Sequence, residues 1–366
     1  MNIDSNAPIG HLFLWGLNVK AKHLAHIESL PDLKALVQSD EYASTPHRYV
    51  LGGGANTLFT TSYFDGMVMV VDTKGIELQK EDEKYSYWKI MAGEDWISLV
   101  EHMVCQNNLG GLENLAYIPG KVGSAPIQNI AAYGQSFENV CESVEVLELD
   151  TLQSFNLQCA ECGFDYRSSI FKQRHMIKDR NFVIWSVTLK LAKPEFHKVE
   201  TGYFSNYESL RSELAVKGVV KPTIQDIYNG VVSLRKNKLP DWTRVGTNGS
   251  LFMNPMVPGN KLRNLLTQFP RLQYYPTEKM QYVDASKLDI HDEKLYKIAA
   301  GHVFDELGWK GKRVGQVGTW KNHALVLCNY GTKNPTDILQ VIRLMQDDFE
   351  SATGIRLEPE INMIPS

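Results

Sequence analysis

Cysteine is scarce in this sequence: only 5 of its 366 residues are cysteine, and the number is odd. Small secreted proteins depend on paired cysteines, so the shortage argues against a disulfide scaffold and suits a reducing compartment. Cys159 and Cys162 form the motif CAEC, a candidate half-site for a metal or a redox pair. No second pair and no histidine cluster accompanies it, so a structural role is favoured for both thiols, and we expect no metal site.

Long apolar runs are also missing. No segment approaches the ~20 consecutive apolar residues that are needed to cross a bilayer. The apolar stretch HLFLWGL near the N-terminus lacks the preceding cationic region and the following small-residue cleavage site of a signal peptide. We therefore expect a cytoplasmic protein with no membrane partner.

Positive charge is not in excess. The net charge is −4, and lysine and arginine are scattered along the chain. A nucleic-acid-binding protein would concentrate them in a basic patch, so nucleic acid is not expected as a partner. The hydrophobic fraction of 43% and the charged fraction of 22% are ordinary for a globular protein. The length allows two or three domains, each with its own core.

Hydrophobic patterning predicts both helices and strands. RYVLGGGANTLFTTSYFDGMVMVV reads as a strand, a glycine turn and a buried strand. Residues 93–111 predict a helix that ends at a pair of glycines, and residues 355–364 predict a closing strand. Thr223 and Asp226 fit a capping box at the start of another helix, and Gly354 fits the C-cap of a third. Because helices and strands intermix without a repeat, the predicted class is α+β.

The turn LGGGANTL holds three successive glycines after a strand. Bare backbone amides in such a turn can bind an anion such as phosphate. The spacing does not match the G-x-G-x-x-G fingerprint, since Thr57 stands at its third glycine position, and no Lys–Ser/Thr pair follows as in a P-loop. A phosphate nest and a plain tight turn remain equally good readings.

The segment GLENLAYIPGKVGSAPIQNIAAYG is nearly uncharged and is too rich in glycine and proline for a long helix. Together with the glycine turn it could line an elongated ligand that bears a pyrophosphate, because glycine permits close backbone approach. Gln128 and Asn129 could then offer amides to a heterocycle. The alternative is two structural loops that pack on each other.

Seven stretches in one order make the sequence recognisable: LGGGANTL, GLENLAYIPGKVGSAPIQNIAAYG, ECGFDYRSSIFK, KLPDW, GTNGSLFMNP, AAGHVFDELGWKGK and LEPEINMI. Over nearly the whole chain they resemble the motifs of the UDP-N-acetylenolpyruvoylglucosamine reductases of peptidoglycan synthesis, in their longer, type I form. The resemblance implies a two-part FAD-binding domain of the vanillyl-alcohol-oxidase (VAO/PCMH) type and a C-terminal α+β substrate-binding domain. The implied boundaries are residues 1–72 with the returning strand 355–366, then 73–220, and then 221–354 for the substrate domain.

The resemblance also implies FAD and NADPH as cofactors and UDP-N-acetylglucosamine enolpyruvate as the small-molecule substrate, and we expect a monomer. The two glycine-rich segments would wrap FAD through Leu51, Gly52, Gly53, Gly54, Ala55, Asn56, Thr57, Leu58, Ile118, Pro119, Gly120, Gly123, Ser124, Gln128, Asn129, Ala131, Tyr133 and Gly134.

Three residues are implied to carry the chemistry. Arg167 would pair with the substrate carboxylate, since its planar fork grips two oxygens and stays charged. Ser250 would donate the proton that completes the reduction, and Glu360 would act with Arg167 on the intermediate. Without the resemblance, the three would read as a surface arginine, a turn serine and an exposed glutamate. Glu358 is the rival of Glu360, because it would share the same strand face.

Substrate contacts are implied for residues of several motifs. Lys238 would contact the diphosphate, Asn254 would add a phosphate hydrogen bond, and a loop at 195–212 would close over the substrate. In that loop Tyr207 is the better match and Tyr203 the rival. The remaining implied contacts are Tyr166, Tyr275, Lys310 and His323.

The sequence departs from the family pattern in places. His323 stands where the family often has glutamine, which puts a uridine contact in doubt, and FLWGLN replaces the usual NTFGID. Two other functions stay open: an FAD oxidase of the same domain type, which would not need Ser250, Lys238 or Glu360, and a UDP-sugar sensor without catalysis. A protein that lacks flavin absorbance would indicate the sensor.

Overall fold

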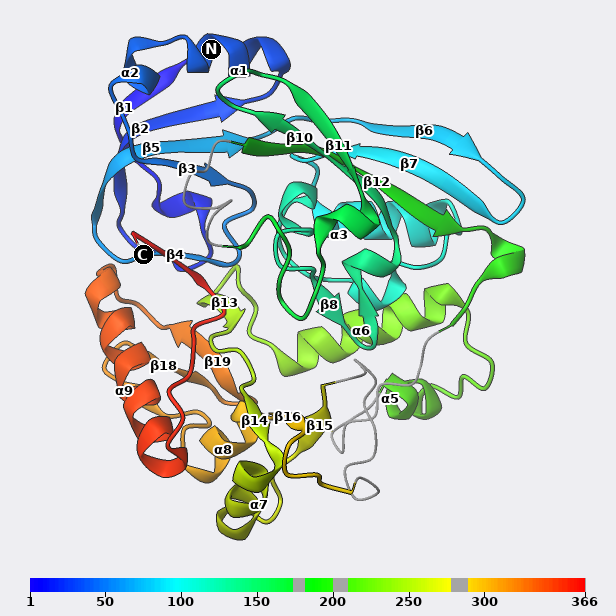
Figure 1. Ribbon diagram of the computed structural model, residues 1–366, viewed down its shortest axis with the longest axis vertical. Helices are drawn as coiled ribbons and strands as arrows, with labels where there is room; N and C mark the ends of the chain where they lie inside the picture. Colours follow the sequence, from blue (N-terminus) through cyan, green and yellow to red (C-terminus); the bar gives the residue numbers. More distant parts are fainter. Residues whose placement is uncertain (174–181, 200–209, 278–288, 366) are drawn as a thin grey trace.

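The computed structural model describes residues 1–173, 182–199, 210–277 and 289–365. Tyr203 and Tyr207 lie outside these residues, as does most of the loop at 195–212. Helices and strands intermix along the chain, so the α+β class is confirmed (Figure 1). Among the described helices, none is both long and apolar enough to pass through a membrane.

The N-terminal sheet has four strands in the order β1-β2-β5-β3. Strand β5 runs parallel to both β2 and β3, and β1 pairs antiparallel with β2. Two short helices connect β2 to β3, and the first of them begins with a serine cap, where the Ser29 hydroxyl accepts from the Asp32 amide at 3.3 Å. The elements are β1 (Ile3–Pro8), β2 (Lys20–Ile27), α1 (Leu30–Val37), α2 (Asp40–Ala43), β3 (Arg48–Leu51) and β5 (Tyr63–Val71).

Strand β5 separates two hydrophobic cores. Met67 and Met69 belong to the core that the N-terminal sheet shares with the central part of the chain, while Val68 and Val70 belong to the core shared with the C-terminal part. Successive side chains of a strand point to opposite faces, so one strand can serve both cores. The buried Val- and Met-rich strand that the sequence predicts is therefore confirmed.

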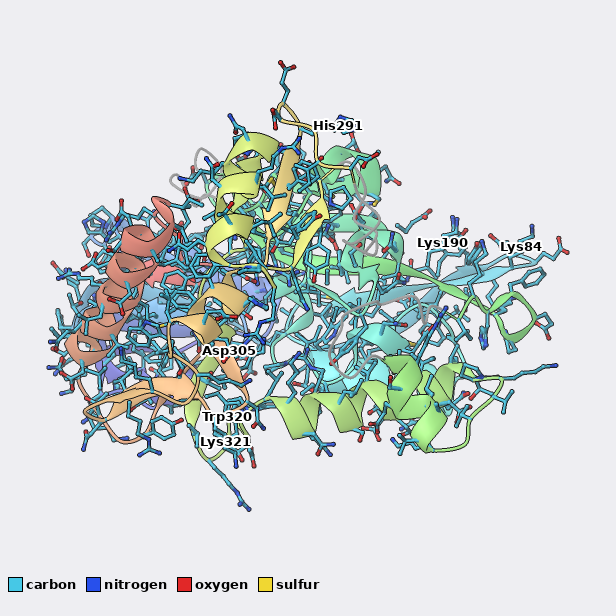
Figure 2. All side chains as sticks on the ribbon, turned by 90° about the horizontal axis from the view of Figure 1, so that it is seen from below. Lys84, Lys190, His291, Asp305, Trp320 and Lys321 are labelled. Carbon is cyan, nitrogen blue, oxygen red and sulfur yellow. The ribbon has the colours of Figure 1, made fainter. Side chains whose placement is uncertain are left out.

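The central sheet is antiparallel, with strand order β11-β10-β12-β7-β6. In Figure 2, the labels of Lys84 and Lys190 mark the outer end of this sheet, on the other side of the molecule from Asp305 and Trp320. The strands are β6 (Ile76–Glu81), β7 (Tyr85–Met91), β10 (Cys141–Glu148), β11 (Ser154–Gln158) and β12 (Phe182–Ala192).

Helices cover one side of the central sheet. Helix α3 (Trp96–Glu101) continues as a π-helical turn, His102–Gln106, and α5 (Leu210–Val216) packs on α6 (Ile224–Lys238). The predicted helix at 93–111 is thus shorter than expected. After its last residue, Gln106, the Asn107 side chain donates to the His102 carbonyl at 2.9 Å and Asn108 adopts a left-handed conformation with φ 52°. Gly110 instead forms a bridge to Ala192.

Two predicted caps are confirmed. At the start of α6, the Thr223 hydroxyl accepts from the Asp226 amide at 3.2 Å, and the Asp226 carboxylate accepts from the Thr223 amide at 2.9 Å. At the end of α9 (Pro335–Thr353), Gly354 adopts the left-handed conformation with φ 65°. Helix α6 matters for the site, because its last turn reaches the cavity described below.

Within its described residues, the C-terminal part contains two small antiparallel sheets and three helices. The sheets have the orders β13-β19-β18-β17 and β14-β16-β15. The elements are β13 (Gly246–Ser250), β14 (Met256–Pro258), α7 (Gly259–Gln268), β15 (Tyr274–Pro276), β16 (Leu295–Ile298), α8 (Ala300–Glu306), β17 (Arg313–Val314), β18 (Val317–Trp320), β19 (His323–Asn329) and α9.

The chain end returns to the N-terminal part. Strand β20 (Asn362–Ile364) pairs in parallel with β4 (Thr57–Phe59), and Figure 1 shows the red C-terminal trace beside that blue strand. The predicted strand at 355–364 is therefore mostly wrong: only its last three residues are strand. Pro359 interrupts it, because proline has no N–H to donate, and forms only an isolated bridge to Phe252.

Candidate active site

A cavity of about 590 Å³ lies where the glycine-rich segments, the end of α6 and strand β13 meet. Most of the predicted cofactor residues line it: Gly52, Gly53, Gly54, Ala55, Asn56, Thr57, Ile118, Pro119, Gly120, Ser124, Gln128, Asn129, Ala131, Tyr133 and Gly134. Leu51 and Leu58 do not line it, because their side chains are buried in the C-terminal core. Gly123 does not line the cavity either. It lies against Ala92, whose carbonyl accepts from the Gly123 amide at 2.9 Å.

The glycines of the first turn are required largely by neighbouring protein atoms. A Cβ on Gly53 would lie 2.6 Å from the Cα of Gly120, and one on Gly54 would lie 2.0 Å from the carbonyl oxygen of Leu12. The two glycine-rich segments therefore do pack on each other at Gly53. They also leave a cavity between them, so packing and ligand binding are not alternatives here.

Other wall positions are bare backbone that faces open space. Gly249 has φ +77° and no atom within 4 Å of an added Cβ, and at Gly120, with φ +138°, the nearest atom would be 3.9 Å away. The Nδ2 of Asn248 donates to the Thr57 carbonyl at 2.9 Å, whereas its buried Oδ1 accepts no hydrogen bond from the described residues. A wall of backbone with a buried acceptor fits a large polar ligand that approaches closely, as FAD would.

Side-chain amides connect the parts of this wall. The Nδ2 of Asn56 donates to Oε1 of Gln128 at 2.8 Å and to the carbonyl of Glu360 at 3.2 Å. The Nδ2 of Asn129 donates to the Asp165 carbonyl at 3.3 Å. Asn56 and Asn129 thus fix the position of the loops, in addition to lining the cavity.

Arg167 and Glu360 form an ion pair on the cavity wall, with Nε of Arg167 2.9 Å from Oε1 of Glu360. Arg167 lies in a tight turn in which Asp165 and Ser168 bond to each other, and its φ of 51° is unusual for a residue with a Cβ. The Glu360 side chain is only 12% exposed. The rival Glu358 is exposed and does not line the cavity.

Ser250 ends β13 and lines the same cavity. It pairs with Val326 of β19 after an irregularity in the ladder that includes Gly249. The amide of Glu360 donates to the carbonyl of Leu251 at 2.8 Å. This contact places the final segment of the chain directly beside β13, so Ser250 and Glu360 come from adjacent backbone.

Among the described residues that line the cavity, basic side chains outnumber acidic ones. Its lining includes Lys121, Arg167, Arg235, Lys238 and Lys297 against three carboxylates, those of Glu138, Asp165 and Glu360. A predominantly positive wall favours anionic ligands such as phosphates and carboxylates.

Three of these cations, Lys121, Arg235 and Lys297, are absent from the sequence predictions. Arg235 lies one turn before Lys238 on α6, and its Nε donates to the Tyr117 carbonyl at 2.8 Å. Burial lowers the pKa of Arg235, although an arginine stays protonated at neutral pH. Burial also lowers the pKa of Lys297, and its Nζ lies 4.2 Å from the centre of the Tyr166 ring.

His323 is held neutral at the cavity wall. Burial, with the positive charges of Lys238 and Lys310, lowers its pKa to about 4. Its Nδ1 accepts from the Leu325 amide at 3.2 Å, so at neutral pH the ring proton is on Nε2. A glutamine at this position would offer an N–H donor of the same kind.

Only some of the other residues predicted to bind the substrate line the cavity. Tyr166 and Lys238 line the cavity, whereas Asn254, Tyr275 and Lys310 do not. The Asn254 Oδ1 instead accepts from the Ala300 amide at 3.0 Å, and the Lys310 Nζ lies 3.3 Å from Oδ2 of Asp305.

Comparison with known proteins gives two matching family models. The model described as "FAD binding domain" matches residues 22–151, and the model described as "UDP-N-acetylenolpyruvoylglucosamine reductase, C-terminal domain" matches residues 241–364. The UDP-N-acetylenolpyruvoylglucosamine reductase of Flavobacterium johnsoniae is 35% identical to the chain, covering 100% of both. The reductase of that name from Vibrio cholerae is 37% identical, covering 100% of the chain and 95% of the relative.

A solved structure has a similar fold. The crystal structure of the UDP-N-acetylenolpyruvylglucosamine reductase from Thermus caldophilus matches with a TM-score of 0.63, and covers 100% of this chain and 98% of that one. At 22% identity, this likeness concerns the fold alone.

Proposed function

The chain belongs to the UDP-N-acetylenolpyruvoylglucosamine reductase family, and from that membership we propose that it reduces UDP-N-acetylglucosamine enolpyruvate to UDP-N-acetylmuramate for peptidoglycan synthesis. It is an oxidoreductase, and FAD and NADPH are the proposed cofactors. The observation that carries the proposal is the Arg167–Glu360 ion pair on the cavity that Ser250 and the two glycine-rich segments also line.

The backbone of the glycine-rich segments is proposed to hold FAD. The backbone beside Gly120 and Gly249, together with the free acceptor of Asn248, supports a ligand that approaches the main chain closely. When bound, FAD supplies the hydride acceptor for NADPH and then the hydride donor for the enol ether. The protein contributes position and electrostatics.

Arg167 is proposed to bind the substrate carboxylate. Addition of hydride to the enol ether leaves negative charge on the neighbouring carbon and its carboxylate, and a fixed guanidinium stabilises that charge. Glu360 holds the Nε side of the guanidinium, which fixes its orientation before the substrate arrives. Glu360 itself is proposed to stabilise the intermediate by hydrogen bonding.

Ser250 is proposed to donate the final proton. A serine hydroxyl is a weak acid, so it can serve only where a strongly basic carbanion develops next to it. Lys297 and Arg167 lie on the same cavity and would stabilise the serine oxyanion that forms.

The diphosphate of the substrate is proposed to lie toward the end of α6. Lys238 was expected there from its motif, and Arg235 adds a second positive charge one turn earlier. His323 would replace the family's glutamine as an N–H donor to the uridine.

The proposed compartment is the cytoplasm. All five cysteines are free thiols, as expected for a protein of a reducing environment. The proposed oligomeric state is a monomer.

An absorbance spectrum tests the proposal directly. The purified protein should be yellow, should bleach on anaerobic addition of NADPH, and should regain its colour when UDP-N-acetylglucosamine enolpyruvate is added. Bleaching without recovery would favour an oxidase with another substrate. A colourless protein that takes up no FAD would exclude both enzymes and leave the UDP-sugar sensor.

A further inference from the structure

Three of the five cysteines meet behind the turn that carries Arg167. Cys141 begins β10, and Cys159–Cys162 form a single 3-10 turn. This turn packs on β10, and the Cys141 thiol lies within electrostatic range of both Cys159 and Cys162. Side chains three residues apart eclipse in a 3-10 helix, so the two thiols of the CAEC motif lie on one face, toward Cys141. The sequence alone did not connect Cys141 with this motif.

The three thiols differ in access and acidity. Cys159 is partly exposed, whereas Cys141 is 7% exposed and Cys162 is 0% exposed. The neighbouring Cys141 thiol lowers the pKa of Cys162, whereas burial raises the pKa of Cys159. A dissolved oxidant therefore meets Cys159 first, and the most readily ionised thiol lies one turn behind it.

The cysteine cluster is bonded to the active-site wall. The carbonyl of Cys162 accepts from the Ile170 amide at 3.0 Å, at the far side of the turn that carries Arg167. The Sγ of Cys159 donates to the Glu138 carbonyl at 3.4 Å, and the Glu138 amide donates to Oδ1 of Asn129 at 3.0 Å. A change in the Cys159–Cys162 turn is thus transmitted within one or two hydrogen bonds to Asn129 and to the Arg167 turn.

We propose that Cys159 and Cys162 form a redox-modification site, in which hydrogen peroxide joins the two thiols as a disulfide and thereby displaces Arg167. First, Cys159 attacks the peroxide: the O–O bond breaks, the sulfur is oxidised to a sulfenic acid, and water leaves. Next, the Cys162 thiolate attacks the Cys159 sulfur, an S–S bond forms, the S–O bond breaks, and a second water leaves. The peroxide is reduced, and Cys141 acts only by holding Cys162 in its reactive form.

A metal is not the occupant that this cluster favours. No group of three or more histidine, cysteine, aspartate or glutamate side chains suited to a metal ion occurs within the described parts of the chain. A thiol cluster without such a geometry is better suited to exchange and oxidation.

The position of the glutamates makes the disulfide easy to map. Glu142 follows Cys141 directly, and Glu161 lies between Cys159 and Cys162, so a glutamate-specific protease separates the three cysteines. The flavin-loaded protein would be treated with peroxide, alkylated with iodoacetamide, digested and analysed by mass spectrometry with and without dithiothreitol. We expect a reducible link between the Cys159 and Cys162 peptides, with the loss of two hydrogen atoms. This readout does not depend on the proposed reaction.

Variants and activity complete the test. In Cys162→Ser, the reaction should stop at a sulfenic acid on Cys159, and in Cys141→Ser the link should form more slowly. Cys105→Ser is the matched control, because Cys105 is exposed in the π-helical turn and should not alter the link. The wild-type disulfide should slow flavin reoxidation by the enolpyruvyl sugar on the order of tenfold, reversibly with dithiothreitol.

Three results would overturn the proposal. Over-oxidation of Cys159 with no link, or a link through Cys141, would contradict the assigned roles. A Cys159–Cys162 disulfide that leaves flavin reoxidation unchanged would show that the disulfide does not displace Arg167. A normal link in a protein with no reductase activity would instead count against the proposed function alone.

Discussion

Nε of Arg167 lies 2.9 Å from Oε1 of Glu360, and the two side chains reach this contact from distant parts of the chain. Arg167 is carried by a tight turn after the Cys159–Cys162 helix, while Glu360 is carried by the segment that runs beside β13 and ends in β20. Because the pair is largely shielded from water, removing one partner leaves the other with an uncompensated charge. The two residues should therefore behave as a unit, with non-additive effects when both are changed.

Replacing Glu360 by glutamine should slow reoxidation of the reduced flavin by the enolpyruvyl sugar by about 10²-fold, because the charge that orients Arg167 is lost. Reduction by NADPH should change little. Stopped-flow absorbance separates the two half-reactions.

Glu358→Gln is the matched control, since Glu358 is exposed and lies two residues away on the same segment. We expect wild-type rates for it. Equal losses in both variants would argue against a specific role for Glu360.

Replacing Ser250 by alanine should leave flavin reduction by NADPH nearly intact and slow flavin reoxidation by the sugar by about 10²-fold or more, the usual range for loss of a general acid. If Ser250 only positioned the cavity wall, its replacement would slow both half-reactions. Ser154→Ala, at an exposed position of β11, serves as the control. Equal slowing of the two half-reactions would remove Ser250 as the proton donor.

Initial-rate kinetics should show whether NADPH and the enolpyruvyl sugar use one shared site or two separate sites. If NADPH and the sugar visit the same cavity in turn, double-reciprocal plots at several fixed NADPH concentrations should be parallel lines. Intersecting lines would mean that both substrates are bound at once, and the cavity of about 590 Å³ would then not be their common site.

The glycine positions show how far the sequence could lead. LGGGANTL indicated close backbone approach, and the structure has such an approach at Gly53. The partner that explains Gly53, however, is the backbone of Gly120, which only tertiary structure brings near. A run of glycines indicates that other atoms lie close to the backbone. It does not indicate whether those atoms belong to a ligand or to the protein itself.

The basic residues of the cavity show what the sequence could not predict. Lys238 was predicted because a motif identifies it, whereas Arg235 lies in an ordinary amphipathic helix and Lys297 in an ordinary short strand. Nothing local distinguishes a cation that faces a cavity from one that faces water. The same applies to Cys141, whose proximity to the CAEC motif results from packing between β10 and the following 3-10 turn.

Gly53→Ala should destabilise the protein and weaken flavin retention, since its Cβ would lie 2.6 Å from backbone that cannot move independently. A cost of about 1–3 kcal/mol is usual for such overpacking. Gly249→Ala is the comparison for stability: its Cβ meets no protein atom but stands at φ +77°, so backbone strain of about 1–2 kcal/mol is expected, and the Cβ would project into the space proposed for FAD. Thermal unfolding and flavin absorbance after gel filtration measure both effects. If Gly53→Ala kept its full stability and flavin, the close approach would not be a constraint.

His323 should make the folded protein sensitive to mild acid. Its pKa is about 4 in the folded state and about 6.5 when unfolded, so between these values the unfolded chain binds a proton that the folded protein does not. The stabilising effect of the neutral ring is complete above about pH 6.5 and is lost as the pH falls to about 4, with a total near 3 kcal/mol.

Replacement of His323 by glutamine should remove this contribution while keeping an N–H donor at the cavity wall. Urea unfolding at pH 7.5 and at pH 4.5 should therefore show a smaller loss of stability in His323→Gln than in the wild type, by about 2 kcal/mol. All other titrating groups are common to both proteins, so their effects cancel in the difference. His291→Gln is the control, because that side chain is exposed at the edge of the molecule (Figure 2) and should leave the difference unchanged. If His323→Gln lost as much stability in acid as the wild type, folding would not lower the pKa of the His323 ring.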